Sequence, residues 1–264
     1  MSETFRLQFL GTGTSTGVPL IGCQCETCRS VDPKDKRWRT SAYLKIGDAH
    51  LIIDTGPDFR AQCLQWQVPH VDAVFITHLH ADHMFGFDDL RRYNTLQNDQ
   101  IITCYCGPET LEGMRRVFPY IDDRPNVAGG LYRPRIVFQA VTEAFTACHA
   151  KLTPLPVLHG RAETYGLRVD AFGKSLAYIP DVHEISEATF GLLEGVDVLV
   201  LNLLRERPHP THLTREIAQA YATRIGAQQT FFTHISHDIP HAQLEQRLGP
   251  TQTIAYDGLV IDIN

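Results

Sequence analysis

Short apolar runs, each bounded by polar or glycine residues, recur along the chain and predict buried strands. The runs that fit this pattern best are 51–53, 74–76, 176–179, 198–201 and 230–232. Segments with the helical spacing of apolar residues lie between them, at 82–96, 108–118, 185–193, 214–225 and 241–248. Because strands and helices alternate, the sequence predicts a layered α/β fold.

Three of these runs, 74–76, 176–179 and 230–232, and the apolar stretch 152–158 each lead to a residue that can bind a metal ion. These residues are His78, His159, Asp181 and His234. Since sheets commonly hold their active sites just beyond the strand ends, we expect the four side chains to gather at one edge of the fold.

The length and composition limit the kind of protein. With 264 residues and 43% hydrophobic content, the chain can bury a substantial core, and we expect one domain over residues 1–264. The net charge of -6 leaves no broad basic surface for long nucleic acid, which favours small substrates. No run of 18 apolar residues and no secretory signal is found, so we expect a cytoplasmic protein without a membrane partner.

The densest group of candidate ligands lies in segment 77–83, which reads THLHADH. Its metal-binding side chains are His78, His80, Asp82 and His83. His78 would close a strand, whereas Asp82 and His83 would open a helix, so the side chains point in different directions. The segment therefore predicts a centre with two metal ions rather than one.

Together with His159, Asp181 and His234, this segment resembles the signature of the metallo-β-lactamase superfamily, in the same order and over nearly the whole chain. The resemblance implies a metal-dependent hydrolase with a four-layer αββα sandwich. It also implies a ligand assignment. One ion is held by His78, His80 and His159, the other by Asp82, His83 and His234, and Asp181 bridges both.

Besides the ligand Asp82, the resemblance gives catalytic roles to Asp54 and His212. Asp54 follows run 51–53, where the family places an Asp that orients the ligands; from the residues alone, an ordinary turn with Gly56 explains it equally well. His212 lies where phosphodiesterase branches carry a His that helps the leaving oxygen depart. His209 is the alternative residue for this role. A third interpretation is that His212 lies in a solvated loop, where Thr211 or Thr214 caps the next helix.

Imidazole and carboxylate ligands suit zinc, manganese or iron, and we expect two divalent ions, zinc or manganese. A centre of two such ions, two carboxylates and a bridging hydroxide would keep a net positive charge. This charge favours an anionic phosphodiester as the substrate. Ala81 stands where flavodiiron proteins carry Glu, which excludes oxygen or nitric oxide reduction. Asp181 stands where zinc β-lactamases use Cys, which separates the chain from them.

A second candidate metal site is the loop at about 22–29, with the pattern Cys23-x-Cys25-x-x-Cys28. Three close thiols in a chain with seven cysteines predict a structural zinc rather than a disulfide. His237 is the candidate fourth ligand. The Gly-rich segment 11–19, the thiols and His237 resemble the PhnP phosphodiesterases, which hydrolyse phosphoribosyl cyclic phosphate, and the resemblance implies the same four zinc ligands.

The predicted function is hydrolysis of a small or cyclic phosphate ester, and several alternatives stay open. A tRNA 3′-processing nuclease usually inserts an RNA-binding arm between the ligand that corresponds to His159 and the bridging Asp. Here only the 21 residues 160–180 lie between His159 and Asp181. A lactonase or thioesterase could use the same metals. A non-hydrolytic accessory protein of the pyrroloquinoline quinone type would keep the cysteine zinc and lose active-site ligands. A homodimer is a further expectation from the resemblance.

Overall fold

The computed structural model describes residues 3–121 and 133–263, which form two seven-stranded sheets. The first sheet has the order β14 (Val260–Asp262), β1 (Phe5–Gly11), β2 (Ser41–Ile46), β3 (Ala49–Ile53), β4 (Ala73–Ile76), β5 (Ile102–Cys106) and β6 (Ile136–Ala140). The second has the order β13 (Gln252–Ile254), β12 (Gln229–Thr233), β11 (Val198–Asn202), β10 (Lys174–Ile179), β9 (Ala162–Ala171), β8 (Ala150–His159) and β7 (Phe145–Ala147).

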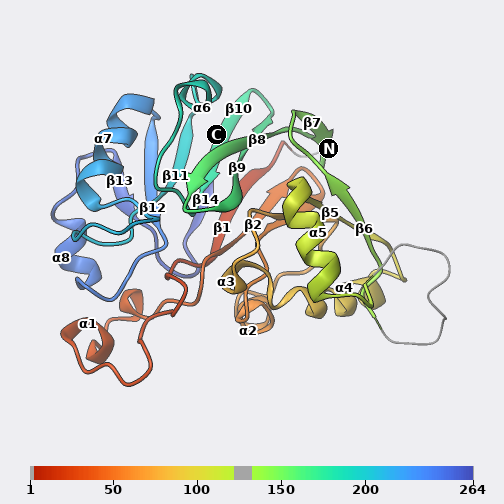
Figure 1. Cartoon of the computed structure of the whole chain (residues 1–264), viewed down its shortest axis with the longest axis horizontal. Helices are drawn as coiled ribbons and strands as arrows, with labels where there is room; N and C mark the ends of the chain where they lie inside the picture. The colour runs from red at the N-terminus through yellow and green to blue at the C-terminus, as the bar shows by residue number, and fades with distance from the viewer. Residues whose placement is uncertain (1–2, 122–132, 264) are drawn as a thin grey trace.

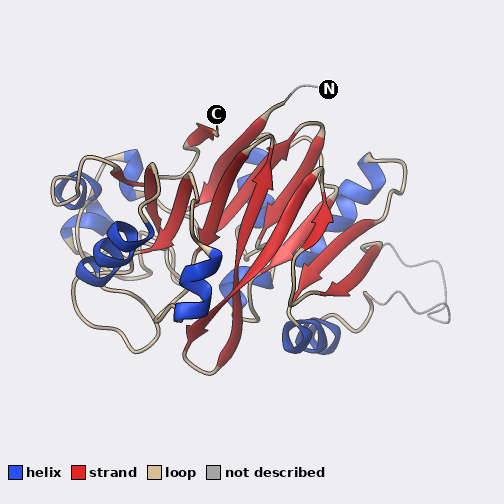
Figure 2. Cartoon of the chain, turned by 90° about the horizontal axis from the view of Figure 1, so that it is seen from above, coloured by secondary structure: helices blue, strands red, loops and turns tan. Residues whose placement is uncertain are grey.

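Helices cover the outer face of each sheet, and the strands lie in the middle of the molecule (Figure 2). The first sheet is covered by α2 (Phe59–Gln65), α4 (Leu90–Leu96) and α5 (Pro108–Val117), and the second by α6 (Glu187–Leu192), α7 (Arg215–Ile225) and α8 (His241–Glu245). Figure 1 shows α2, α4 and α5 on one side of the molecule and α6, α7 and α8 on the other. The predicted four-layer αββα arrangement is confirmed.

The alternation of side chains along the strands builds these layers. In β4, Phe75 points into the core between the sheets, while Val74 and Ile76 point toward the helices. In β10, Tyr178 points into the central core and Ile179 toward the outer helices. Both β4 and β10 are buried on their two faces, which explains why their sequences are continuously apolar rather than alternating.

Strands occupy all five predicted runs, but two predicted helices are wrong in extent. Segment 82–96 is divided into α3 (Ala81–Met84), a 3₁₀ turn at Phe87–Asp89, and α4. The break occurs at Gly86, where an added Cβ would lie 2.2 Å from the carbonyl oxygen of Gly56. The two loops pack so closely that a continuous helix has no room. The last helix, α8, also ends three residues earlier than predicted.

The remaining short elements are α1 (Glu26–Arg29) and a 3₁₀ turn at Pro33–Asp35, both in the connection between β1 and β2. This connection lies at the sheet edge where β3 and β4 end, because Ala42 at the start of β2 pairs with Ile53 at the end of β3. None of the helices in the described parts of the chain is long and apolar enough to cross a membrane.

Candidate metal centre

The candidate ligands meet at the edge where the parallel strands end. His78 follows β4, Asp181 follows β10 and His234 follows β12. His159 is the last residue of β8, which runs parallel to β10 because both strands are antiparallel to β9. The other candidates come from the segment around α3, at His80, Asp82 and His83.

Three histidine nitrogens form the first group of ligand atoms. Nδ1 of His80 lies 2.9 Å from Nε2 of His78 and 3.3 Å from Nε2 of His159. His78 and His159 are buried, whereas His80 is exposed. The group therefore opens to solvent on the side of His80.

The second group consists of Asp82, His83, Asp181 and His234, whose ligand atoms all lie within 4.8 Å of one another. Oδ1 of Asp181 lies 3.0 Å from Nε2 of His234, and Oδ2 contacts Nε2 of His83. The same Oδ2 is 3.5 Å from Nε2 of His78 in the first group. Asp181 therefore reaches both groups.

The hydrogen bonds behind these rings fix which nitrogen faces the centre. Nδ1 of His159 lies 2.7 Å from the carbonyl oxygen of Thr211, which can only accept, so Nδ1 carries the proton. Burial lowers the pKa of His159, which keeps the ring neutral. Its Nε2 therefore presents a lone pair to the first group. Such an arrangement is typical of metal-binding histidines.

Several buried polar atoms at the centre make no hydrogen bond with the described residues, and their only polar neighbours are the other side chains of the centre. They are Nε2 of His83, Nε2 of His234, Oδ1 of Asp181 and Nδ1 of His212. Buried polar atoms are rarely left unpaired, and each such group needs an explanation. A divalent cation would satisfy these atoms together, and the His and Asp donors suit zinc, manganese or iron. The residues therefore fit a metal centre.

The electrostatics of the second group require a positive charge. Burial would lower the pKa of His83, but Asp82 and Asp181 outweigh burial and raise that pKa well above its ordinary value. Burial would raise the pKa of Asp181, but His234 and His83 hold it well below its usual range. These two carboxylates therefore favour a positive charge at this position, which a divalent cation would supply.

Asp54 is fully buried behind His83. Its carboxylate accepts hydrogen bonds from Nδ1 of His83 at 2.7 Å and from the backbone N–H and hydroxyl of Thr77 at 2.8 and 2.9 Å. Both Asp54 and His234 have left-handed backbone conformations, with φ of 63° and 60°. Non-glycine residues are strained in this region, and such strain gathers at functional sites. Asp54 makes the contact that its predicted orienting role requires.

His212 lies against the ligands, whereas His209 does not. The His212 ring is stacked on His234 with ring centroids 4.7 Å apart, and Nδ1 lies 3.3 Å from Oδ1 of Asp181. Burial and the neighbouring His234 lower the pKa of His212 to about 2. Nδ1 of His209 instead accepts a hydrogen bond from the backbone of Thr211 within its own turn. Thr214 caps α7, as the alternative reading expected, and His212 still points to the centre.

The cysteine loop forms the second candidate metal site. The Sγ atoms of Cys23, Cys25 and Cys28 lie 3.4, 3.3 and 3.6 Å from Nδ1 of His237, and no pair of these thiols is in a disulfide. Three sulfurs and one imidazole nitrogen around one point are a donor set for tetrahedral zinc. These four residues could therefore hold a zinc ion with no open position.

Sequence reasoning missed two contacts of the centre, from Thr77 and Thr211. Because Thr77 directly precedes His78, the sequence places it near the centre. The sequence does not indicate its hydrogen bonds to Asp54. Thr211 acts through its carbonyl oxygen, which leaves no signal in the residue type.

Comparison with known proteins agrees with this geometry. The family described as "Beta-lactamase superfamily domain" matches residues 50–235. This range includes every candidate ligand of the His/Asp centre and also Asp54 and His212, but not the cysteine loop. The chain therefore belongs to the beta-lactamase superfamily, whose members bind divalent metal ions.

Within this superfamily, the chain is similar to a crystal structure of a diphosphatase from the PhnP family. The two share 37% sequence identity with a TM-score of 0.89, over 98% of each chain. The PhnP-like resemblance is thus confirmed. Zn²⁺-bound PqqB from Methylobacterium extorquens shares the fold, with a TM-score of 0.78 at 23% identity, over 98% of this chain and 100% of that chain.

A curated relative with a different name is the octanoyltransferase of Porphyromonas gingivalis. It is 35% identical over 258 residues, which cover 96% of this chain but 51% of that protein. The chain therefore spans about half the length of this relative.

Proposed function

We propose that the chain is a binuclear metal-dependent phosphodiesterase that cleaves a small or cyclic phosphate ester. The observation that carries the proposal is the contact of Asp181 with both ligand groups, with Nδ1 of His212 only 3.3 Å from the same carboxylate. The similarity to a PhnP-family diphosphatase supports the same reaction class.

In this proposal each ligand group holds one ion, zinc or manganese. His78, His80 and His159 hold one, Asp82, His83 and His234 hold the other, and Asp181 is shared. Paired metal ions lower the pKa of water and stabilise charge that builds on phosphorus. Two divalent ions outweigh the charges of Asp82 and Asp181, so the centre keeps a positive charge. An anionic ester uses that charge better than a neutral lactone or thioester does.

The chain's own residues provide position and hydrogen bonds. Asp54 holds the proton of His83 at Nδ1 and so keeps Nε2 toward the centre. His212 is partly exposed beside Asp181, where the N–H of its neutral ring can donate a hydrogen bond to the oxygen that leaves phosphorus. Thr211 fixes His159 through its carbonyl oxygen, and it adjoins His212 in the chain. One loop therefore positions both a ligand and this hydrogen-bond donor.

We also propose a structural zinc at Cys23, Cys25, Cys28 and His237. Its loop is joined to the catalytic edge, because the backbone N–H of Thr14 donates to Ile235 at 3.1 Å and the N–H of Ile235 donates to Thr12 at 2.9 Å. Ile235 lies between His234 and the zinc ligand His237. The zinc would thus brace the strand end that carries His234.

The segment between His159 and Asp181 argues for small substrates. It consists almost entirely of β9 and β10, which are joined by a short turn at Phe172 and Gly173. These strands are integral to the second sheet and leave no space there for an inserted RNA-binding arm. This feature supports a small ester over precursor tRNA as the substrate.

The experiment that tests the proposal is a comparison of initial rates with zinc or manganese added. The substrates are bis(p-nitrophenyl) phosphate, a p-nitrophenyl thioester and a simple lactone. We expect hydrolysis of the phosphodiester, and loss of that hydrolysis in Asp181→Ala. Hydrolysis of only the lactone or thioester would overturn the phosphodiesterase assignment. Cleavage of precursor tRNA would support the nuclease alternative instead.

A further inference from the structure

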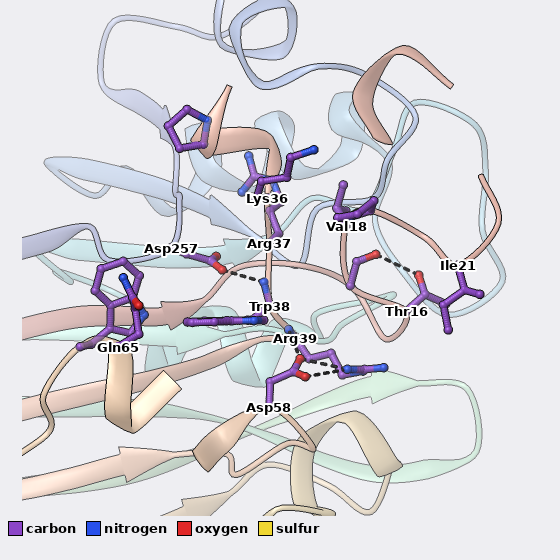
Figure 3. Close-up of a pocket in the computed structure, with 14 residues that line it drawn as sticks. Thr16, Val18, Ile21, Lys36, Arg37, Trp38, Arg39, Asp58, Gln65 and Asp257 are labelled. Carbon is purple, nitrogen blue, oxygen red and sulfur yellow. Dashed lines mark hydrogen bonds and ion pairs between the residues drawn. The ribbon is translucent and has the colours of Figure 1, made fainter. Parts of the chain in front are cut away.

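A cavity of about 640 Å³ lies between segment 16–21, segment 36–39 and the C-terminal end of α2 (Figure 3). Its volume falls in the range of small-molecule sites, about 300–1,000 Å³. None of the His or Asp candidate ligands lines this cavity. The cavity is therefore a feature that the metal centre does not explain.

Flat aromatic and apolar side chains form its walls. Trp38 and Trp66 both line it, with ring centroids 6.2 Å apart and rings nearly perpendicular at 73°. Figure 3 shows Trp38 on one side of the cavity and Val18 and Ile21 on the other. Ile21 is 96% exposed, so it is free to contact a ligand. Walls of this kind suit a planar aromatic group, because any such group presents a face that stacks on indole.

The polar groups of the cavity suit a ligand that carries both N–H donors and a negative charge. The carboxylate of Asp257 accepts from the hydroxyl of Thr12 at 2.7 Å and from the backbone N–H of Trp38 at 2.6 Å, which leaves further lone pairs for a ligand donor. Arg39 is paired with Asp58 at 2.9 Å. The ammonium of Lys36 donates to the carbonyl oxygen of Cys28 at 3.2 Å and forms no ion pair with any residue that the structure describes, so its other N–H groups are available to an anion.

The walls of the cavity are attached to the catalytic edge from two sides. Segment 16–18 continues from Thr14, whose N–H donates to Ile235 beside His234. On the other side, a Cβ added to Gly56 would lie 3.8 Å from Cβ of Arg39 and 2.0 Å from the carbonyl oxygen of Asp82. Gly56 therefore lies between Arg39, which lines the cavity, and the backbone of Asp82. The cavity and the segment that carries Asp82 thus share Gly56 as a neighbour.

We propose that this cavity is a substrate subsite that holds the heteroaromatic base of a nucleotide-type phosphoester. The base stacks on Trp38 against Val18 and Ile21, its N–H groups face Asp257, and Lys36 attracts the negative charge. This inference rests on the proposed function, since it names the class of ester that the metal centre cleaves.

The test uses the fluorescence of the protein itself. Trp38 and Trp66 are the only two tryptophans in the chain, and both line the cavity, so all tryptophan emission reports on it. We expect adenosine 5′-monophosphate to quench this emission to saturation, and ribose 5-phosphate, which has the same anion without the base, to leave it unchanged. Trp38→Leu should weaken binding about tenfold, with Trp66 as the remaining reporter. Phe172→Leu, in the turn between β9 and β10, is the matched control and should bind as the wild type does.

A second variant guards against a folding defect in Trp38→Leu. Ile21→Asp changes an exposed side chain and replaces an apolar contact of the base with a charge, so it should also weaken binding. No quenching by adenosine 5′-monophosphate, or equal affinity in wild type, Trp38→Leu and Ile21→Asp, would overturn the subsite. Hydrolysis of bis(p-nitrophenyl) phosphate with no quenching removes the subsite alone. Saturable quenching that persists in Asp181→Ala, without hydrolysis by the wild type, supports the cavity as a ligand site and removes only the phosphodiesterase.

Discussion

The carboxylate of Asp54 accepts a hydrogen bond from Nδ1 of His83 at 2.7 Å, and Nε2 of the same ring contacts Asp181. A buried residue that binds no metal itself therefore determines how one ligand faces the centre. Asp54 adopts its left-handed backbone to reach this position. The strained backbone of Asp54 is thus connected to Asp181 through the ring of His83.

Replacement of Asp54 should weaken metal binding. In Asp54→Asn the charged acceptor behind His83 is lost, and we expect metal affinity to fall about 10- to 100-fold. A competition titration against a zinc chelator measures this change. Asp170→Asn, which alters a carboxylate paired with Arg168 far from the centre, is the control and should keep the wild-type affinity. Unchanged affinity in Asp54→Asn would show that His83 needs no orienting partner.

Loss of His212 should reduce turnover without loss of metal. We expect His212→Ala to lower kcat about 10²- to 10³-fold, because a hydrogen-bond donor to the leaving oxygen is removed while the seven ligands stay. His209→Ala is the matched control, since His209 lies outside the ligand groups, and should retain wild-type turnover. The measurement is kcat on bis(p-nitrophenyl) phosphate together with metal content. Equal losses in the two variants would remove the special role of His212.

The cysteine site should govern stability and one metal equivalent. Cys25→Ser removes one of four zinc ligands, so we expect loss of the structural zinc and a lower Tm. Thermal unfolding and elemental analysis of the same preparation check both effects. Cys148→Ser, which changes a thiol in the turn between β7 and β8, should keep the zinc. A Cys25→Ser protein with normal Tm and full zinc content would contradict the structural site.

His241 should make stability depend on pH. Burial, then the charges of Arg37 and Lys34, lower the pKa of its ring to about 4, against the opposing charges of Asp32 and Asp35. The unfolded chain titrates near about 6.5, so it binds more protons between these values, and acidification reduces the free energy of unfolding. The contribution of His241 is complete above about 6.5 and is lost as the pH falls toward 4.

The test compares urea unfolding of wild type and His241→Gln at about pH 7 and about pH 5. We expect the difference in unfolding free energy between the two proteins to shrink at the lower pH. Both proteins contain the other titrating groups, such as Asp257, whose pKa burial raises to about 6. The effects of these groups on the unfolding free energy therefore cancel in the difference. A difference that does not change with pH would show that His241 titrates alike in both states.

The ligand groups could be predicted because dense His and Asp residues at strand ends have few structural explanations. Segment 77–83 is the clearest case, and the structure brings its side chains together with His159, Asp181 and His234. The helix predicted over 82–96 could not be corrected from sequence, since its break depends on the contact of Gly86 with Gly56.

Strand β9 was not predicted, although the apolar stretch 152–158, which leads to His159, indicated β8. Pro154 and Pro156 lie within β8, although proline donates no hydrogen bond to a ladder. The cavity between Trp38 and Trp66 has no sequence signal, because α2 and the connection after β1 meet only in the folded chain. Local patterns therefore define the ligands, while contacts between loops define the surroundings.

The central claim is that the chain binds two ions at the His/Asp centre and one at the cysteine loop. Elemental analysis of purified protein, after growth with zinc and manganese, tests it most directly. We expect about three metal ions per chain, with about one remaining in a variant that lacks both Asp181 and His83 side chains. A wild-type protein with a single bound zinc, unchanged after incubation with either metal, would contradict the binuclear centre.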